Sequence, residues 1–121
     1  MTNPVTFSLP MPPSVNALYT NNSGKGKRGR AKSQRYLSWI TEAGIELNRQ
    51  RVPTLTPPYS IEYAVGRPDK RKRDVANLEK PLSDLLVSMD VIEDDSLIDD
   101  NRQRWCPKVP PGMVHCTVES L

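Results

Sequence analysis

Hydrophobic and polar positions repeat with two different periods along the chain. Residues 5–9 and 59–65 alternate apolar and polar side chains, which predicts two strands with one buried face each. Residues 33–50 repeat apolar positions every three or four residues, and so does a segment that begins between 74 and 77 and ends at about 89. These two segments are predicted to be helices.

Local signals support these boundaries and add two strands at the end of the chain. Ser33 is a plausible N-cap for the first helix, and Pro81 suits the first turn of the second. Residues 102–106 and 113–118 are candidate strands, joined by a turn at 107–112. The order of elements predicts a single compact α+β or α/β domain over residues 1–121, around a small sheet. The strand order is not readable from the pattern.

Charge is segregated along the chain rather than mixed, although the net charge is only +3. Residues 14–32 are polar and carry glycines among cations, which predicts a basic flexible loop that becomes ordered on a ligand. A second basic cluster spans 67–73, whereas residues 90–100 carry acids and no base. Basic loops suit a polyanion and an acidic turn suits a divalent cation, although each run alone is also typical of solvated surface.

Composition narrows the class of protein further. No stretch is long and apolar enough to span a membrane, and no signal-peptide core precedes the first strand, so we expect a cytoplasmic protein. Cys106 and Cys116 match no metal-ligand spacing, and we expect both to be reduced thiols.

The candidate catalytic centre is Asp74, Asp95 and Lys80, and we expect the side chains of Asp74 and Asp95 to approach each other closely with Lys80 beside them. Hydrolysis of a phosphodiester uses carboxylate oxygens to hold Mg²⁺ against the phosphate, and a nearby lysine stabilises the charge that develops there. Each residue alone has an ordinary interpretation, because aspartates cap helices and helix lysines are commonly solvated.

Three motifs in this sequence resemble those of the RusA family of Holliday junction resolvases. The run 71–80, with the sequence Arg-Lys-Arg-Asp-Val-Ala-Asn-Leu-Glu-Lys, is similar to the family's basic residues, Asp-x-Asp-Asn and following lysine. Residues 91–96 (Val-Ile-Glu-Asp-Asp-Ser) resemble its second acidic motif, and residues 9–16 (Leu-Pro-Met-Pro-Pro-Ser-Val-Asn) resemble its opening Pro-Pro-Ser-x-Asn. Together the motifs span nearly the whole chain in the family's order.

The resemblance implies an α+β fold with a small mixed sheet and two main helices. It also implies a homodimeric, Mg²⁺-dependent endonuclease, with Mn²⁺ as an alternative metal, from a bacterium or prophage. It would resolve four-way DNA junctions by paired nicking in recombination and repair. Asp74, Asp95 and Lys80 would be catalytic, Asp94 would help Asp74 and Asp95 hold the metal, and Asn77 would support the site. The residues expected to bind DNA are Asn16, Lys25, Lys27, Arg28, Arg30, Lys70, Arg71, Lys72 and Arg73.

One position departs from the family pattern, because Ala76 stands where the middle carboxylate is expected. Either Asp94 or Glu93 supplies the missing oxygen, or the change is an engineered inactivation, or the protein binds junctions without cutting them. A non-catalytic module for branched DNA is therefore the second hypothesis. An unrelated RNA-binding protein is the third, and the acidic turn argues against it.

Two further expectations concern the helix at 33–50 and the tryptophans. Trp39 falls within the helical pattern and is expected to pack in the core or at an interface, whereas Trp105 is a candidate for base stacking. A dimer interface is expected on apolar residues of a helix or strand, first of all those at 36–47.

Overall fold

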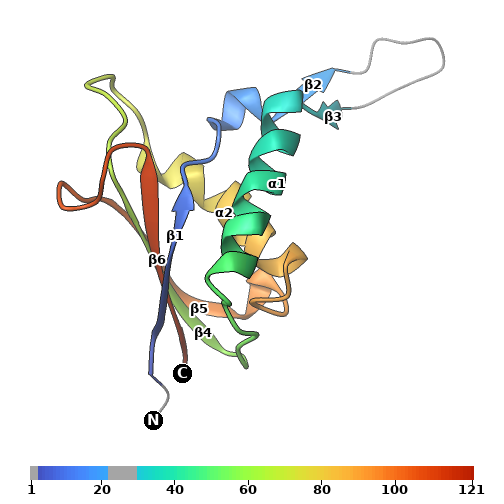
Figure 1. Ribbon diagram of the computed structural model, residues 1–121, viewed down its shortest axis with the longest axis vertical. Helices are drawn as coiled ribbons and strands as arrows, with labels where there is room; N and C mark the ends of the chain where they lie inside the picture. The colour runs from blue at the N-terminus through green and yellow to red at the C-terminus, as the bar shows by residue number, and fades with distance from the viewer. Residues whose placement is uncertain (1–2, 22–29) are drawn as a thin grey trace.

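A four-stranded mixed sheet forms one layer of the molecule, and both helices lie on one of its faces (Figure 1). The computed structural model describes residues 3–21 and 30–121. The sheet has the order β1-β6-β4-β5. Strand β6 pairs antiparallel with both β1 and β4, whereas β4 pairs parallel with the edge strand β5. The strands are β1 (Val5–Pro10), β4 (Tyr59–Val65), β5 (Ile98–Trp105) and β6 (Met113–Ser120).

One face of this sheet carries the main hydrophobic core. In β4 the odd positions Tyr59, Ile61, Tyr63 and Val65 are all buried, as the period of two predicts. Both helices pack on this face, and their buried side chains join the strand residues in a single cluster. The α+β architecture with a mixed sheet and two main helices is thus confirmed.

Helix α1 (Gln34–Arg49) begins where the sequence predicts. The Ser33 side chain accepts a hydrogen bond from the Tyr36 N–H, as an N-cap does. Tyr36, Ala43 and Leu47 are buried on the side that faces the sheet.

The buried stripe of α1 packs within the chain, so it is not available for the expected dimer interface. The large apolar side chains that α1 leaves exposed are Leu37 and Ile45. Trp39 is also in the core, where its indole Nε1–H donates to the Pro10 carbonyl at 2.8 Å. The core alternative expected for Trp39 is therefore correct.

The second helical segment starts as a tighter turn than expected. Residues Val75–Leu78 form the 3-10 helix η2, and the α-helix α2 covers Glu79–Ser88. Pro81 lies in the first turn of α2, where a missing N–H costs little. After α2 the chain turns back, and Val91 and Ile92 are buried in the same core cluster as the helix.

Two segments differ from the sequence-based expectation. Within 14–32, expected to be a loop throughout, the structure has the 3-10 turn η1 (Val15–Ala17) and a two-stranded ribbon of β2 (Tyr19–Asn21) and β3 (Arg30–Lys32). Strand β5 begins at Ile98 rather than 102, so part of the expected acidic turn belongs to the sheet. Pairing with β4 explains this, since it overrides the poor strand propensity of Asp99 and Asp100.

Some expectations fall outside what the structure describes. Lys25, Lys27 and Arg28 lie outside the described residues, and of Arg30 only the backbone in β3 is described. In the described part of the chain, no helix combines the length and apolar character needed to cross a membrane.

Candidate active site

An acidic cavity of about 500 Å³ lies between α2, α1 and the turn that follows α2. Lys80, Asp84, Asp94 and Asp95 line it together. The Lys80 Nζ lies 2.9 Å from Asp84 Oδ1 and 3.9 Å from Asp95 Oδ2. Two of the three predicted catalytic residues, Lys80 and Asp95, are therefore neighbours, and Asp94 is beside them.

The fold brings these residues together by reversing the chain after α2. The backbone N–H groups of Val91 and Ile92 both donate to the Leu86 carbonyl, which fixes the reversal. The Tyr59 hydroxyl then accepts from the Glu93 N–H at 3.0 Å. As a result the turn η3 (Asp95–Leu97) lies against α2, with Asp94 as its N-cap.

The adjacent carboxyls of Asp94 and Asp95 favour a cation beside them, in a cavity that Lys32 and Lys80 also line. The pKa of the Asp95 carboxyl is raised, first because it shares a hydrogen bond with the Asp94 carboxyl and then because of partial desolvation. The pKa of Asp94 is lowered, since the Ser96 N–H donates to it. The pKa of Lys80 is raised, mainly by its hydrogen bond to Asp84. Adjacent carboxylates repel one another, and Lys80 relieves this only in part because its side chain is 65% exposed.

Asp74 occupies a second cavity, of about 260 Å³, together with Asn77, Arg73, Ser14 and Trp105. It is the N-cap of η2, and its Oδ1 accepts the Ala76 N–H at 3.0 Å. From Asp74 to Lys80 the chain follows four residues of 3-10 helix and the start of α2, a rise of roughly 11 Å. Asp74 and Asp95 line different cavities, which have no lining residue in common.

Carboxylate oxygens are the type of ligand that a hard divalent cation binds, but the carboxylates of this cavity do not by themselves form a complete metal site. Within residues 3–21 and 30–121, no group of three or more His, Cys, Asp and Glu side chains is arranged to hold a metal ion. In phosphoryl-transfer sites Mg²⁺ is usually held by one or two carboxylates, with water and substrate phosphates completing its ligands. The adjacent carboxyls of Asp94 and Asp95 match that smaller requirement.

The basic segment after β4 faces solvent beside the Asp74 cavity. The Arg73 guanidinium is bound to Asp69 at 2.8 Å, whereas Arg71 lies 4.0 Å from the same carboxylate and is 82% exposed. The side chains of Lys70 and Lys72 are exposed. Asn16, in η1, is exposed as well, and it does not line either of these cavities.

From the sequence, Asp84 had no assigned role in the site, and Trp105 was only a candidate for base stacking. Asp84 binds Lys80 one helical turn away, and this spacing of four residues was a detectable signal. Trp105 lies beside Asp74, and the Arg67 guanidinium lies over its ring at 4.4 Å from the centroid. The Trp105 ring lies next to Arg67 and Asp74 because β5 pairs with β4.

A mixed-sheet domain with adjacent carboxylates, a lysine and flanking cations carries the residue types that a small metal-dependent nuclease uses. The family model of endodeoxyribonuclease RusA matches residues 10–114. The chain is 30% identical over 119 residues to the crossover junction endodeoxyribonuclease RusA of Shigella sonnei, covering 98% of this chain and 97% of that protein. The RusA protein of Escherichia coli K12 is 28% identical over 122 residues, and that of Enterobacteria phage HK97 is 30% identical over 125, each with the same coverage.

The chain therefore belongs to the RusA family of endodeoxyribonucleases. Its enzyme class is that of a hydrolase acting on DNA, and nucleases of this family depend on divalent metal ions in general.

Proposed function

We propose that this protein is a Mg²⁺-dependent endonuclease that resolves four-way DNA junctions by paired nicking, in recombination and repair. The observation that carries the proposal is the Lys80–Asp95 contact, with Asp94 adjacent, in a chain of this family. The names of the relatives from Shigella sonnei and phage HK97 give crossover junctions as their substrate.

The residues have distinct roles in this proposal. Asp94 and Asp95 provide adjacent carboxylate oxygens for Mg²⁺, or for Mn²⁺ as its substitute. Asp74, supported by Asn77, provides a further carboxylate from its own cavity. When bound, the cation polarises the phosphoryl group and lowers the pKa of a bound water. Lys80 stabilises the negative charge that develops on the phosphate or its leaving oxygen.

A homodimer accounts for paired cutting, because two nicks in a four-way junction require two sites related by a two-fold axis. A chain of 121 residues also has a limited core and gains from a shared interface. Light scattering should show a dimer at micromolar concentration, and a monomer would contradict paired cutting. The bacterial and phage sources of the relatives support a cytoplasmic DNA substrate.

A second function, binding of branched DNA without cleavage, is favoured by one residue. Ala76 is exposed at the start of η2 and offers no metal ligand. Under this alternative the cationic segments still hold the junction, and the carboxylates remain without a functional cation.

Incubation of the full chain with a synthetic four-way junction, with Mg²⁺ and with a chelator, tests the first function. Asp95→Asn is the test variant, and Asp90→Asn, an exposed acid outside the cavity, is the matched control. We expect cleavage by the unaltered chain and by D90N with Mg²⁺ only, and loss of cleavage in D95N. Binding without cleavage by the unaltered chain would favour the second function.

A further inference from the structure

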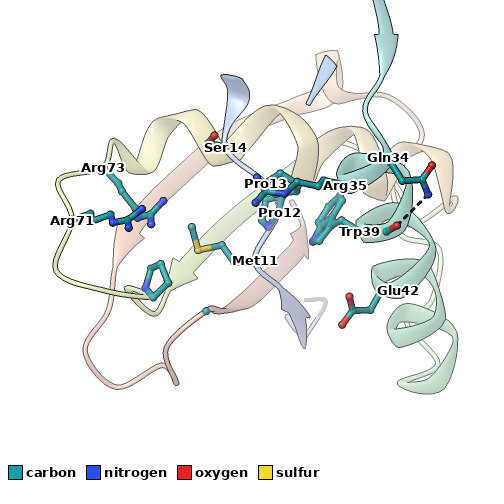
Figure 2. Close-up of a pocket in the computed structure, with 13 residues that line it drawn as sticks. Met11, Pro12, Pro13, Ser14, Gln34, Arg35, Trp39, Glu42, Arg71 and Arg73 are labelled. Carbon is teal, nitrogen blue, oxygen red and sulfur yellow. Dashed lines mark hydrogen bonds between the residues drawn. The ribbon is translucent and has the colours of Figure 1, made fainter. Parts of the chain in front are cut away.

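The largest cavity described here lies outside the candidate active site, between α1 and the basic segment 67–73 (Figure 2). We propose that it holds the sugar–phosphate backbone of a single DNA strand, and that Arg35 is a phosphate-contacting, positioning residue there. This inference rests on the proposed function, because it takes DNA as the substrate. It adds a path for the strand and a residue that the family motifs do not include.

Two walls of different origin enclose this cavity of about 740 Å³. Gln34, Arg35, Ser38 and Glu42 of α1 form one wall, and the loop residue Arg71 belongs to the other. Between them the cavity is lined by Met11, Pro12, Pro13 and Ser14 (Figure 2). The volume is that of a site for roughly one or two nucleotides, and is too small for a duplex.

Charge in the cavity suits a phosphate, and Arg35 is the cation best placed to bind one. In the described chain, Arg35 forms no ion pair, whereas Asp69 engages Arg73 at 2.8 Å. Arg71 is only weakly engaged, at 4.0 Å from Asp69. A planar guanidinium without a carboxylate partner is a preferred phosphate contact.

The cavity is continuous with the one that contains Asp74. Met11, Ser14 and Arg73 line both, so a strand can pass from Asp74 along the Pro12–Ser14 segment to Arg35. The apolar surfaces of Met11 and the prolines suit deoxyribose, while the arginines suit phosphates. Glu42, at the opposite end of the α1 wall, repels phosphates and so limits how far the strand extends along α1.

The occupant is a single strand, because the two strands of each arm separate where the arms of a four-way junction meet. Contacts of this kind fix the position of the backbone and read no base sequence. We therefore expect the cavity to set where the strand lies relative to Asp74, without a preference for a base.

Arg35→Gln removes the charge, and Arg49→Gln on the same helix is the matched control. Arg49 is exposed at the far end of α1, paired with Glu46. The probes are a short oligothymidine and a synthetic four-way junction, bound without added divalent metal over a range of salt. For one phosphate contact on a single strand, R35Q should lower the salt slope by about 0.7 and the affinity about fivefold at about 0.1 M salt. R49Q should change neither.

A second variant tests the cavity itself without changing charge. Ser38→Trp fills the α1 wall, and Ile45→Trp places the same side chain on an exposed position outside the cavity. S38W should weaken oligothymidine binding, and I45W should not. Equal binding by R35Q and R49Q would overturn the inference, as would weakening by R35Q without any effect of S38W, because Arg35 would then act from outside the cavity.

The junction assay separates this inference from the proposed function. If the unaltered chain cuts four-way junctions but R35Q and R49Q bind both probes equally, the function stands and the strand path is wrong. If R35Q and S38W weaken oligothymidine binding but no variant or parent cuts a junction, the strand path stands and the cleavage function is wrong.

Discussion

The ammonium group of Lys80 lies 3.9 Å from the Asp95 carboxylate, although α2 and the reversal after it separate the two residues in the chain. Lys80 is held at the same time by Asp84, at 2.9 Å. Because all three side chains are partly exposed, these ion pairs contribute little to folding stability. We propose instead that their position serves chemistry on a phosphate.

Lys80→Gln should therefore reduce junction cleavage about 100- to 1000-fold, the usual loss when one donor to a developing negative charge is removed. The dissociation constant for the junction should change much less, since many phosphate contacts remain. Cleavage rates at saturating enzyme and binding measured without metal distinguish these effects. The free energy of unfolding should change by less than about 0.5 kcal/mol.

Asp84→Asn is the control for a structural role of Lys80. It breaks the same intrahelical ion pair but keeps the lysine beside Asp95. We expect D84N to retain most cleavage activity. If D84N and K80Q lose activity equally, Lys80 acts by supporting α2 and not by stabilising the phosphate.

Ala76→Asp should strengthen Mg²⁺ binding, because it returns a carboxylate to the turn that begins at Asp74. An increase of about tenfold in affinity corresponds to about 1.4 kcal/mol. Calorimetry and the Mg²⁺ dependence of cleavage measure it, with Ala76→Asn as the uncharged control of similar size. Cleavage that appears only in A76D would identify Ala76 as a disabling change, and an active parent would assign the missing oxygen to Asp94 or Glu93.

Replacing Gly66 or Gly112, both near the turn before β6, should lower the free energy of unfolding by different amounts. A Cβ at Gly66 would lie 2.1 Å from the Pro110 carbonyl oxygen and 2.5 Å from that of Val109, both backbone atoms. Gly66→Ala should thus lower the free energy of unfolding by about 3 kcal/mol or more. At Gly112 no atom lies within 4 Å and only the φ of +77° opposes a side chain, so Gly112→Ala should cost about 1–2 kcal/mol. Urea denaturation of both variants checks the order.

The two thiols should differ sharply in reactivity. Burial raises the pKa of Cys116 far above its ordinary value. The pKa of Cys106 is lowered, first because the Lys108 N–H donates to its sulfur, and Cys106 keeps 8% of its surface exposed against 0% for Cys116. Since the thiolate is the reactive form, one thiol should react with a disulfide reagent at neutral pH in the native protein and the second only after unfolding. Two fast-reacting thiols in the native state would contradict the burial of Cys116.

Local sequence patterns predict most of the elements because those elements are determined locally. The N-cap Ser33, the stripe of α1 and the alternation of β4 are all readable from neighbouring residues, and the structure has them where expected. Strand β5 was shortened in the prediction because Asp99–Asn101 have no strand signal of their own. Their conformation comes from pairing with β4, which no local pattern encodes.

The candidate site, too, was predictable only in part: its residues can be read from the sequence, but their contacts cannot. Motif spacing points to Asp74, Lys80 and Asp95, but the Lys80–Asp95 contact depends on the reversal fixed by Val91 and Ile92. Asp74 was expected to approach Asp95 closely, but it caps the 3-10 helix η2 and lines a different cavity. The opposition of Arg35 and Arg71 across a cavity is a tertiary relationship, and the sequence shows only that both are basic.

The most direct test of the central claim is to map the nicks made in a synthetic four-way junction by the full chain with Mg²⁺. We predict nicks at symmetric positions in two opposing strands near the crossover, with no cutting of a linear duplex of the same sequence and none by Lys80→Gln. Cleavage of linear duplex and junction at equal rates, or an unaltered chain that binds the junction and leaves all four strands intact with Mg²⁺ and Mn²⁺, would contradict it.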